Sequence, residues 1–157
     1  MALFREVTET DLDVLFAHWK DPEANRMAAF APADPSDREA FDERWRRFCE
    51  SDDITALVIE VDGEVVGSIG SWTNDGEREV TFWLGREHWG KGIATRALAE
   101  FLADVERTRP VQASTAHDNV GSQRVLEKCG FRRVGERRAF ATSRGEELDE
   151  VLFRLDG

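Results

Sequence analysis

Cysteine is scarce in this sequence. Cys49 and Cys129 are the two thiols among 157 residues, and each falls on the apolar stripe of a predicted helix. Two cysteines in a chain of this length make neither a disulfide framework nor a cysteine-rich metal site. We therefore expect both to be reduced side chains of the core, and we expect no metal.

Basic residues are also in deficit. The chain has 21 Lys and Arg residues against 32 Asp and Glu residues, which gives a formal net charge of −11. This balance argues against a nucleic-acid partner, which requires a basic face, and it disfavours an anionic membrane surface. It is compatible with steering a cationic substrate, such as an amine, toward an acidic cleft, and equally with solubility alone.

Long apolar runs are missing as well. No run reaches the length of a membrane span, and the N-terminus lacks the basic-then-apolar pattern of a signal peptide. The chain nevertheless has 41% hydrophobic residues, with ten Phe, five Trp and no Tyr, which is enough to bury a core. We expect a single domain over residues 1–157 in the cytoplasm.

Hydrophobic periodicity predicts a mixed order of elements. A strand over residues 3–7 is followed by two amphipathic helices, the second starting at a capping box formed by Ser36 and Glu39. The predicted elements that follow are, in order, a three-stranded meander over 55–85, a helix over 93–105 that ends by Arg109-Pro110, a strand over 111–116, a helix capped by Asn119, and strands over 131–141 and 147–155. This order predicts an α+β fold, a mixed sheet with one right-handed parallel crossover between residues 79–85 and 111–116.

A glycine-spaced loop lies at that crossover. The stretch from Arg86 to Thr95 reads REHWGKGIAT and joins the last meander strand to a long helix. Such a loop presents several unpaired backbone N–H groups to one point, which makes it an anion site, and phosphate is the usual anion. Two common phosphate motifs are absent, because no Gly-Lys-Ser/Thr ends the loop and the third glycine of the dinucleotide fingerprint is missing.

Two segments together carry a more specific pattern. The first is Trp89-Gly-Lys-Gly-Ile-Ala94, and the second is Asn119-Val-Gly-Ser-Gln-Arg-Val-Leu-Glu-Lys-Cys-Gly-Phe131. In this order, after an antiparallel meander, they resemble the GNAT superfamily of acyl-CoA-dependent N-acyltransferases. The first looks like the family's Gln/Arg-x-x-Gly-x-Gly/Ala motif, with Trp89 where Gln or Arg is common. The aromatic residue and the Asn-x-x-Ser segment point to the branch that contains the ribosomal-protein N-terminal acetyltransferases.

The resemblance implies a fold and a donor site. The fold is a twisted, mostly antiparallel sheet with helices on both faces, whose one parallel strand pair splays apart. The donor is acetyl-CoA, whose pyrophosphate would be held by the backbone of Trp89, Gly90, Lys91, Gly92, Ile93 and Ala94. Lys91 either adds charge there or faces solvent. The pantetheine arm would lie in the gap between the splayed strands, against the backbone of Phe82, Trp83 and Leu84 and the side chain of Asn119.

The implied reaction is direct acyl transfer, in which a neutral amine attacks the thioester and CoA leaves as the thiolate. By resemblance, Ser122 would lie near the sulfur and protonate that thiolate. Glu79 is our first candidate for the base that accepts the amine's proton through a water molecule. Structural alternatives stay open: Asn119 and Ser122 also suit an N-cap and a first helical turn, and Glu79 also suits a surface acid.

Other polar side chains are rivals or structural. His117 and Asp118 are competing bases, although the entry to a helix explains both. His88 flanks the loop and is expected to shape it, and His18 is expected to be a partly exposed structural histidine.

The implied function is an N-acetyltransferase that moves an acetyl group from acetyl-CoA to a primary amine in a ternary complex. The acceptor is either a peptide N-terminus, which an open groove beside residues 25–35 would suit, or a small amine such as an amine antibiotic or polyamine, which a closed acidic pocket would suit. The alternative from another class is a non-catalytic CoA-binding module that acts in sensing or assembly. Homodimer formation is left open.

Overall fold

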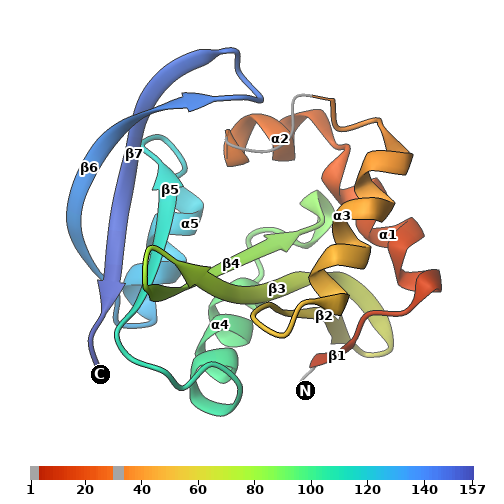
Figure 1. The fold of residues 1–157 in the computed structure, drawn as a ribbon, viewed down its shortest axis with the longest axis horizontal. Helices are drawn as coiled ribbons and strands as arrows, with labels where there is room; N and C mark the ends of the chain where they lie inside the picture. The colour runs from red at the N-terminus through yellow and green to blue at the C-terminus, as the bar shows by residue number, and fades with distance from the viewer. Residues whose placement is uncertain (1–3, 30–33) are drawn as a thin grey trace.

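The computed structural model describes residues 4–29 and 34–157 (Figure 1). Its elements are, in order, β1 (Phe4–Glu6), α1 (Glu9–Trp19), α2 (Pro22–Ala28), α3 (Arg38–Glu50), β2 (Thr55–Val61), β3 (Glu64–Asn74), β4 (Glu77–Leu84), the 3-10 helix η1 (Arg86–His88), α4 (Ile93–Asp104), β5 (Val111–Ala116), α5 (Val120–Lys128), β6 (Arg132–Ala141) and β7 (Glu146–Leu155). Among these, no helix has both the length and the apolar composition needed to cross a membrane.

The strands form one mixed sheet in the order β1-β2-β3-β4-β5-β7-β6. Neighbouring strands are antiparallel except β4 and β5, which are parallel and are joined through α4. The predicted mixed class and its one parallel crossover are therefore confirmed for the described residues.

Helices cover both faces of this sheet. Leu98 and Phe101 of α4 and Leu126 of α5 belong to the core on one face, and Leu15 of α1 and Trp45 of α3 belong to the core on the other. The period of two along a strand explains the division, since successive side chains point to opposite faces. In Figure 1, α1 and α3 lie together beside β1 and β2, and α5 lies beside β5.

The start of α3 differs from the predicted capping box. The N-cap is Asp37, whose Oδ1 accepts a hydrogen bond from the Ala40 N–H at 3.0 Å. Ser36 is engaged elsewhere, because its hydroxyl donates to Asp34 Oδ1 at 2.6 Å. The prediction of Ser36 as the cap was wrong by one residue, because a local turn competes for the serine side chain.

The end of α4 also comes earlier than predicted. The helix stops at Asp104, although the sequence pattern carries it through Val105 and toward Arg109. After the helix, Glu106, which is only 6% exposed, pairs with Arg78 of β4 at 2.9 Å. This ion pair holds the segment that follows α4 against β4.

The two cysteines differ in burial. Both are free thiols, but Cys49 is exposed and Cys129 is half-buried against the core on the α4 face. The expectation that Cys49 is a core side chain was wrong. At about 100° per residue, Cys49 lies about 80° around α3 from Phe41, at the edge of the buried stripe.

Candidate active site

The parallel strands β4 and β5 pair over a very short length. Their register contains only Arg78 with Val111 and Glu79 with Gln112, although β4 continues to Leu84. Beyond this point the strands diverge, and the sheet opens between them (Figure 1). The splayed pair that the family resemblance implied is therefore present.

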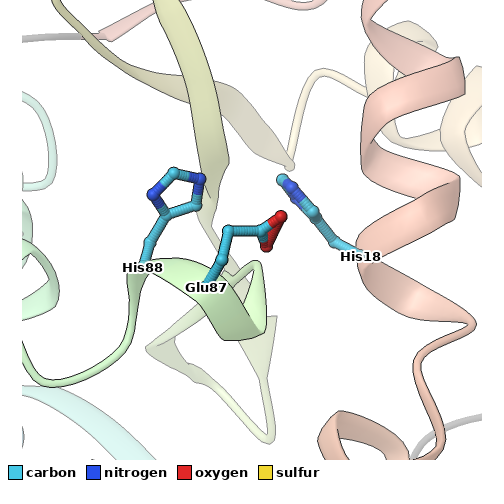
Figure 2. Close-up of side chains that lie close together, drawn as sticks. All are labelled: His18, Glu87 and His88. Atoms are coloured by element: carbon cyan, nitrogen blue, oxygen red, sulfur yellow. The ribbon is translucent and has the colours of Figure 1, made fainter.

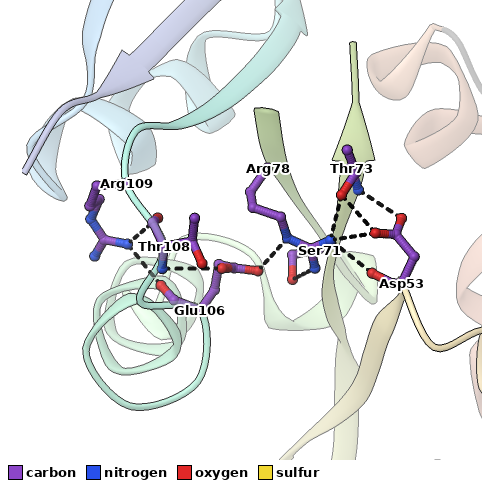
Figure 3. A network of polar contacts seen from close by, with 7 residues as sticks. All are labelled: Asp53, Ser71, Thr73, Arg78, Glu106, Thr108 and Arg109. Atoms are coloured by element: carbon purple, nitrogen blue, oxygen red, sulfur yellow. Dashed lines mark hydrogen bonds and ion pairs between the residues drawn. The ribbon is translucent and has the colours of Figure 1, made fainter. Parts of the chain in front are cut away.

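A polar network fixes the joined end of the splayed pair (Figure 3). Arg78 donates to Glu106 Oε1 at 2.9 Å, to Asp53 Oδ1 at 3.0 Å and to Ser71 Oγ at 3.1 Å. Burial disfavours the charged form of Glu106, but hydrogen bonds from Ser71 and Arg78 outweigh it and lower the pKa of that carboxyl. The network ties together the segment before β2, strands β3 and β4, and the segment before β5, at the end where β4 and β5 still pair.

Backbone groups of β4 face the gap between the strands. Gly85 N–H donates to the Val66 carbonyl at 3.0 Å, on the β3 side. Because successive strand residues direct their backbone groups to opposite neighbours, those of Phe82 and Leu84 face the β5 side and those of Trp83 face β3. Of the three residues predicted to contact pantetheine through their backbone, Phe82 and Leu84 therefore border the gap.

The glycine loop follows β4 directly. Gly90 and Gly92 have φ values of +76° and +77°, a backbone conformation that residues other than glycine rarely adopt. Gly92 is the N-cap of α4, with no side-chain cap and no acidic residue in the first turn. The first N–H groups of α4 and the positive end of its dipole are thus directed at one place, as an anion site requires.

Side chains around the loop hold its shape. The Trp89 indole N–H donates to the Leu84 carbonyl at 3.1 Å, which anchors the loop to the end of β4. Ile93 and Ala94 pack against the core on the α4 face, whereas Lys91 is exposed. The backbone of the predicted anion site is therefore positioned by packing beneath it.

Asn119 and Ser122 stand at the start of α5, across the gap from β4. Asn119 Oδ1 accepts the Ser122 N–H at 3.2 Å, and Asn119 Nδ2 donates to the Met27 carbonyl of α2 at 3.2 Å. The predicted N-cap is confirmed. Both residues also line the cavity described next, and the Asn119 amide retains a second N–H for a ligand.

A cavity of about 560 Å³ extends from the splayed strands to α1 and α3. Phe82, Asn119 and Ser122 border it on the side of the gap. The rest of its wall is rich in aromatic residues, with one basic and two acidic side chains: Trp19, Trp45, Phe48, Trp72, Trp83, Arg44, Glu79 and Glu150. The two early helices do form one wall of a cleft, as the sequence suggested by analogy.

The family model for the acetyltransferase (GNAT) domain matches residues 2–132. The chain belongs to the GNAT acetyltransferase family. An uncharacterized N-acetyltransferase, p20 of Bacillus licheniformis, is 27% identical over 96% of this chain and 90% of its own length.

Solved structures of GNAT proteins share the fold. The ribosomal-protein-alanine N-acetyltransferase from Brucella melitensis superposes with a TM-score of 0.82 at 24% identity, over 99% of this chain and 100% of that one. The structure of AAC(6')-Ib in complex with ribostamycin and coenzyme A gives a TM-score of 0.77 at 20% identity, over 98% and 92% of the two chains. At these identities, the likeness establishes the architecture.

In this GNAT chain, Glu79 lies at the joined end of the splayed strands. It is half-buried and lines the cavity, so it is not an exposed surface acid. Burial raises the pKa of Glu79, a hydrogen bond from Asn74 Nδ2 at 2.8 Å opposes the shift, and the negative charge of Glu150 adds to it. A carboxyl with a raised pKa is a better proton acceptor near neutral pH.

Glu150 was missed at the sequence level. It is 7% exposed on β7, it lines the cavity, and its Oε1 accepts a hydrogen bond from Arg137 Nε at 2.6 Å. One signal was available, because Glu150 stands between Leu148 and Leu152 on the same face of the strand. An acid in an inward-facing position of that pattern indicates a functional or paired carboxylate.

The rival bases lie outside the described cavity wall. Asp118 forms two hydrogen bonds with the Arg144 guanidinium at 2.7 and 2.8 Å, and this partner lowers the pKa of Asp118. His117 is exposed. Arg144 also donates to the Arg26 carbonyl at 2.8 Å, so the Asp118 pair fastens the β6–β7 turn to α2 instead of serving the cavity.

His18 and His88 meet where α1 packs on η1 (Figure 2). Their ring centroids are 6.3 Å apart, and they are 8% and 7% exposed, so the prediction of a partly exposed His18 was wrong. A Cβ atom on Gly85 would lie 2.5 Å from the His18 ring, which shows how closely the two elements pack. Burial lowers the pKa of His18, although the negative charge of Glu87 opposes the shift.

His18, Glu87 and His88 have the spacing of metal ligands. Their potential ligand atoms lie within 4.8 Å of one another, and among the described residues this is the group that could hold a metal ion. None of the three lines the cavity. The cluster positions η1, and through it the glycine loop, but it is separate from the splayed strands.

Proposed function

We propose that this GNAT protein transfers an acetyl group from acetyl-CoA to the primary amine of a small acceptor. The observation that carries the proposal is the cavity at the splayed strands, because β4, Ser122 and Glu79 line one space and the glycine loop directly follows β4. We propose residues 1–157 as one domain that holds both substrates.

Donor binding follows from the loop and the gap. The pyrophosphate is held by the backbone of residues 89–94 and the N-terminus of α4, which carries no competing cap. The pantetheine arm pairs with the backbone of Phe82 and the N–H of Leu84 as an added strand, since the Leu84 carbonyl already accepts the Trp89 indole N–H, and Asn119 contributes its remaining N–H. Backbone N–H groups of β4 then polarise the thioester carbonyl and stabilise the oxyanion.

The chemical step needs two proton transfers. The neutral amine attacks the thioester carbon. As the C–N bond forms, the amine nitrogen loses a proton, which Glu79 accepts through a water molecule. The C–S bond then breaks, Ser122 donates its hydroxyl proton to the thiolate, and the serine oxygen regains a proton from solvent, to which Glu79 releases the proton it took from the amine. A positioned base of this kind contributes roughly 10²- to 10⁴-fold. The raised pKa of Glu79 supports this assignment over Asp118, whose pKa is lowered.

The sequence did not decide between a peptide N-terminus and a small amine as the acceptor. A cavity whose wall contains two carboxylates supports a small amine, which is attracted as the ammonium ion before it is deprotonated. The volume of about 560 Å³ lies within the range of small-molecule sites, and part of it is needed for the thioester end of CoA. The peptide alternative depended on a groove beside residues 25–35, of which residues 30–33 lie outside the described part of the chain.

Release of free thiol from acetyl-CoA tests the proposal. Purified protein is incubated with acetyl-CoA and a panel of primary amines, and thiol release and the mass of the acetylated product are measured. We expect amine-dependent release that falls when Glu79 is replaced by Gln, with the largest loss at pH values above the raised pKa of Glu79, where the wild-type carboxylate is ionised and can accept a proton. Tight CoA binding without any amine-dependent release would instead favour a non-catalytic CoA-binding module.

A further inference from the structure

Arg44 of α3 is a half-buried cation in the cavity wall without a described partner. It lines the cavity, yet it makes no hydrogen bond or ion pair with any residue in the described ranges. Burial lowers the pKa of Arg44, and the nearby charge of Arg47 lowers it further, with no carboxylate acting in the other direction. The guanidinium remains charged, since arginine is not deprotonated in proteins.

Other shielded arginines of this chain are paired. Arg78 and Arg144, with side chains 17% and 11% exposed, each bind carboxylates at 3.0 Å or less. The chain has 32 acidic residues, so carboxylates are not in short supply. A desolvated charge without a partner is costly, and such groups in clefts mark functional sites. Arg44 therefore departs from the pattern that the rest of the molecule follows.

Trp19 and Trp45 flank Arg44 in the cavity wall, while their indole nitrogens are buried and have no surface toward the cavity. Trp19 also holds Arg44 in place, because the guanidinium carbon lies 5.9 Å from the centroid of its ring. A guanidinium that stacks on an aromatic face keeps its N–H edge free for a planar anion.

Stacked rings connect Arg44 with the site of acyl transfer. Trp19 stacks on Trp83 of β4 with a centroid distance of 5.1 Å and an interplanar angle of 21°. Trp83 lies between Phe82 and Leu84, whose backbone borders the gap. An acceptor in this cavity therefore has carboxylates near its amine and an unpaired guanidinium farther along the same wall.

We propose that Arg44 binds an acidic group of the acceptor, so that the substrate class is a small amine that also carries a carboxylate or a related anion, as an amino acid does. This inference rests on the proposed function and adds the acceptor's second charge. Aromatic walls on either side suit an apolar body between the two charged ends. A polyamine, which has no anionic group, would leave Arg44 unpaired in the complex.

The test compares amino acids with their decarboxylated amines. Phenylalanine with phenethylamine and tryptophan with tryptamine are assayed for thiol release with wild type, Arg44→Met, Arg44→Lys and the control Arg47→Met. Arg47 lies on the same helix and is exposed, so its replacement removes an equal charge outside the cavity. Thermal melting establishes that each variant is folded.

We expect wild type to prefer the member of a pair that has the extra carboxylate. Arg44→Met should lose roughly 10- to 100-fold in kcat/KM for that member, the range for a hydrogen bond to a charged group, and little for the decarboxylated amine. Arg44→Lys should lose less, and Arg47→Met should resemble wild type. Equal rates for both members in wild type, or an equal loss for both in Arg44→Met, would overturn the proposal.

A binding measurement separates this proposal from the proposed function. If no amine supports thiol release, acetyl transfer fails as the function, and the anion subsite is tested with amino acids and their amines by quenching of tryptophan fluorescence in the presence of CoA. Saturable quenching by the acids alone, lost in Arg44→Met, supports the subsite, and equal quenching or none refutes it. Faster turnover of peptides with an acidic side chain than of free amino acids would overturn the assignment to small molecules.

Discussion

Replacing Gly92 by Glu should abolish most acetyl-CoA binding. The structure distinguishes two effects of this change, backbone strain on folding and charge repulsion on binding. Gly92 has a φ of +77°, and a Cβ atom placed there would meet nothing within 4 Å. The cost to folding is thus backbone strain alone, about 1–2 kcal/mol for a residue other than glycine in this region. For a chain of this size, that corresponds to a fall in Tm of roughly 2–8 °C.

The cost to ligand binding is electrostatic and larger. A carboxylate at the N-cap of α4 would lie beside the proposed pyrophosphate, where no other acid occupies the first turn. At about 6 Å and an effective dielectric constant of about 40, each phosphate charge is repelled by roughly 1.4 kcal/mol. Two such charges amount to about 3 kcal/mol, or on the order of 100-fold weaker binding.

Two control variants isolate the charge. Gly92→Ala introduces strain without charge, and it should bind acetyl-CoA within a few-fold of wild type. Gly76→Glu adds the same charge at an open turn between β3 and β4, where φ is +82°. Calorimetric titration gives the affinities, and thermal melting gives the strain. Equal acetyl-CoA affinity in Gly92→Glu and Gly76→Glu would refute the assignment of the loop as the pyrophosphate site.

Three further predictions concern the splayed strands and the buried histidine. Ser122→Ala should lower kcat more than it weakens acetyl-CoA binding, and unchanged turnover would remove Ser122 from the mechanism. Glu106→Gln should lower the free energy of unfolding in urea by roughly 1–3 kcal/mol, because the shielded Arg78 loses one of its two carboxylate partners. Glu43→Gln removes a carboxylate from an exposed ion pair and should cost under about 1 kcal/mol. The pKa of His18 is lowered in the folded state, so the unfolded chain binds a proton at His18 more readily, and the free energy of unfolding should fall as the pH drops below about 6.5. His18→Gln should reduce that fall. Identical pH profiles of stability for wild type and His18→Gln would contradict this prediction.

Much of the donor half could be predicted from the sequence, because it depends on local chemistry. The α4 stripe, the left-handed glycines of the loop and the Asn119 cap each follow from a few neighbouring residues. One parallel crossover follows from the order of elements and its handedness rule. Residue roles in CoA binding and catalysis stay predictions, although the strands that should carry them do diverge as expected.

Other expectations failed where a distant segment decided the outcome. His18 is buried because η1, about 70 residues later in the chain, packs against it, and the segment after α4 is held against β4 by the pair of Glu106 with Arg78. Cys49 is exposed because it lies at the edge of the α3 stripe, where the described elements leave it uncovered. Periodicity identifies a face of a helix, but burial at the edge of that face depends on what packs there.

The sequence by itself determined that this chain folds as a GNAT protein and predicted where an anion would bind, since helix starts, glycine conformations and strand order are set by short-range rules. Only the tertiary structure decided the character of the cavity. Glu79, Glu150 and Arg44 come from β4, β7 and α3, and nothing in their separate neighbourhoods predicts that they line one space. The lack of a partner for Arg44 among the described residues is a property of the packed molecule, because it depends on how the surrounding elements place their carboxylates.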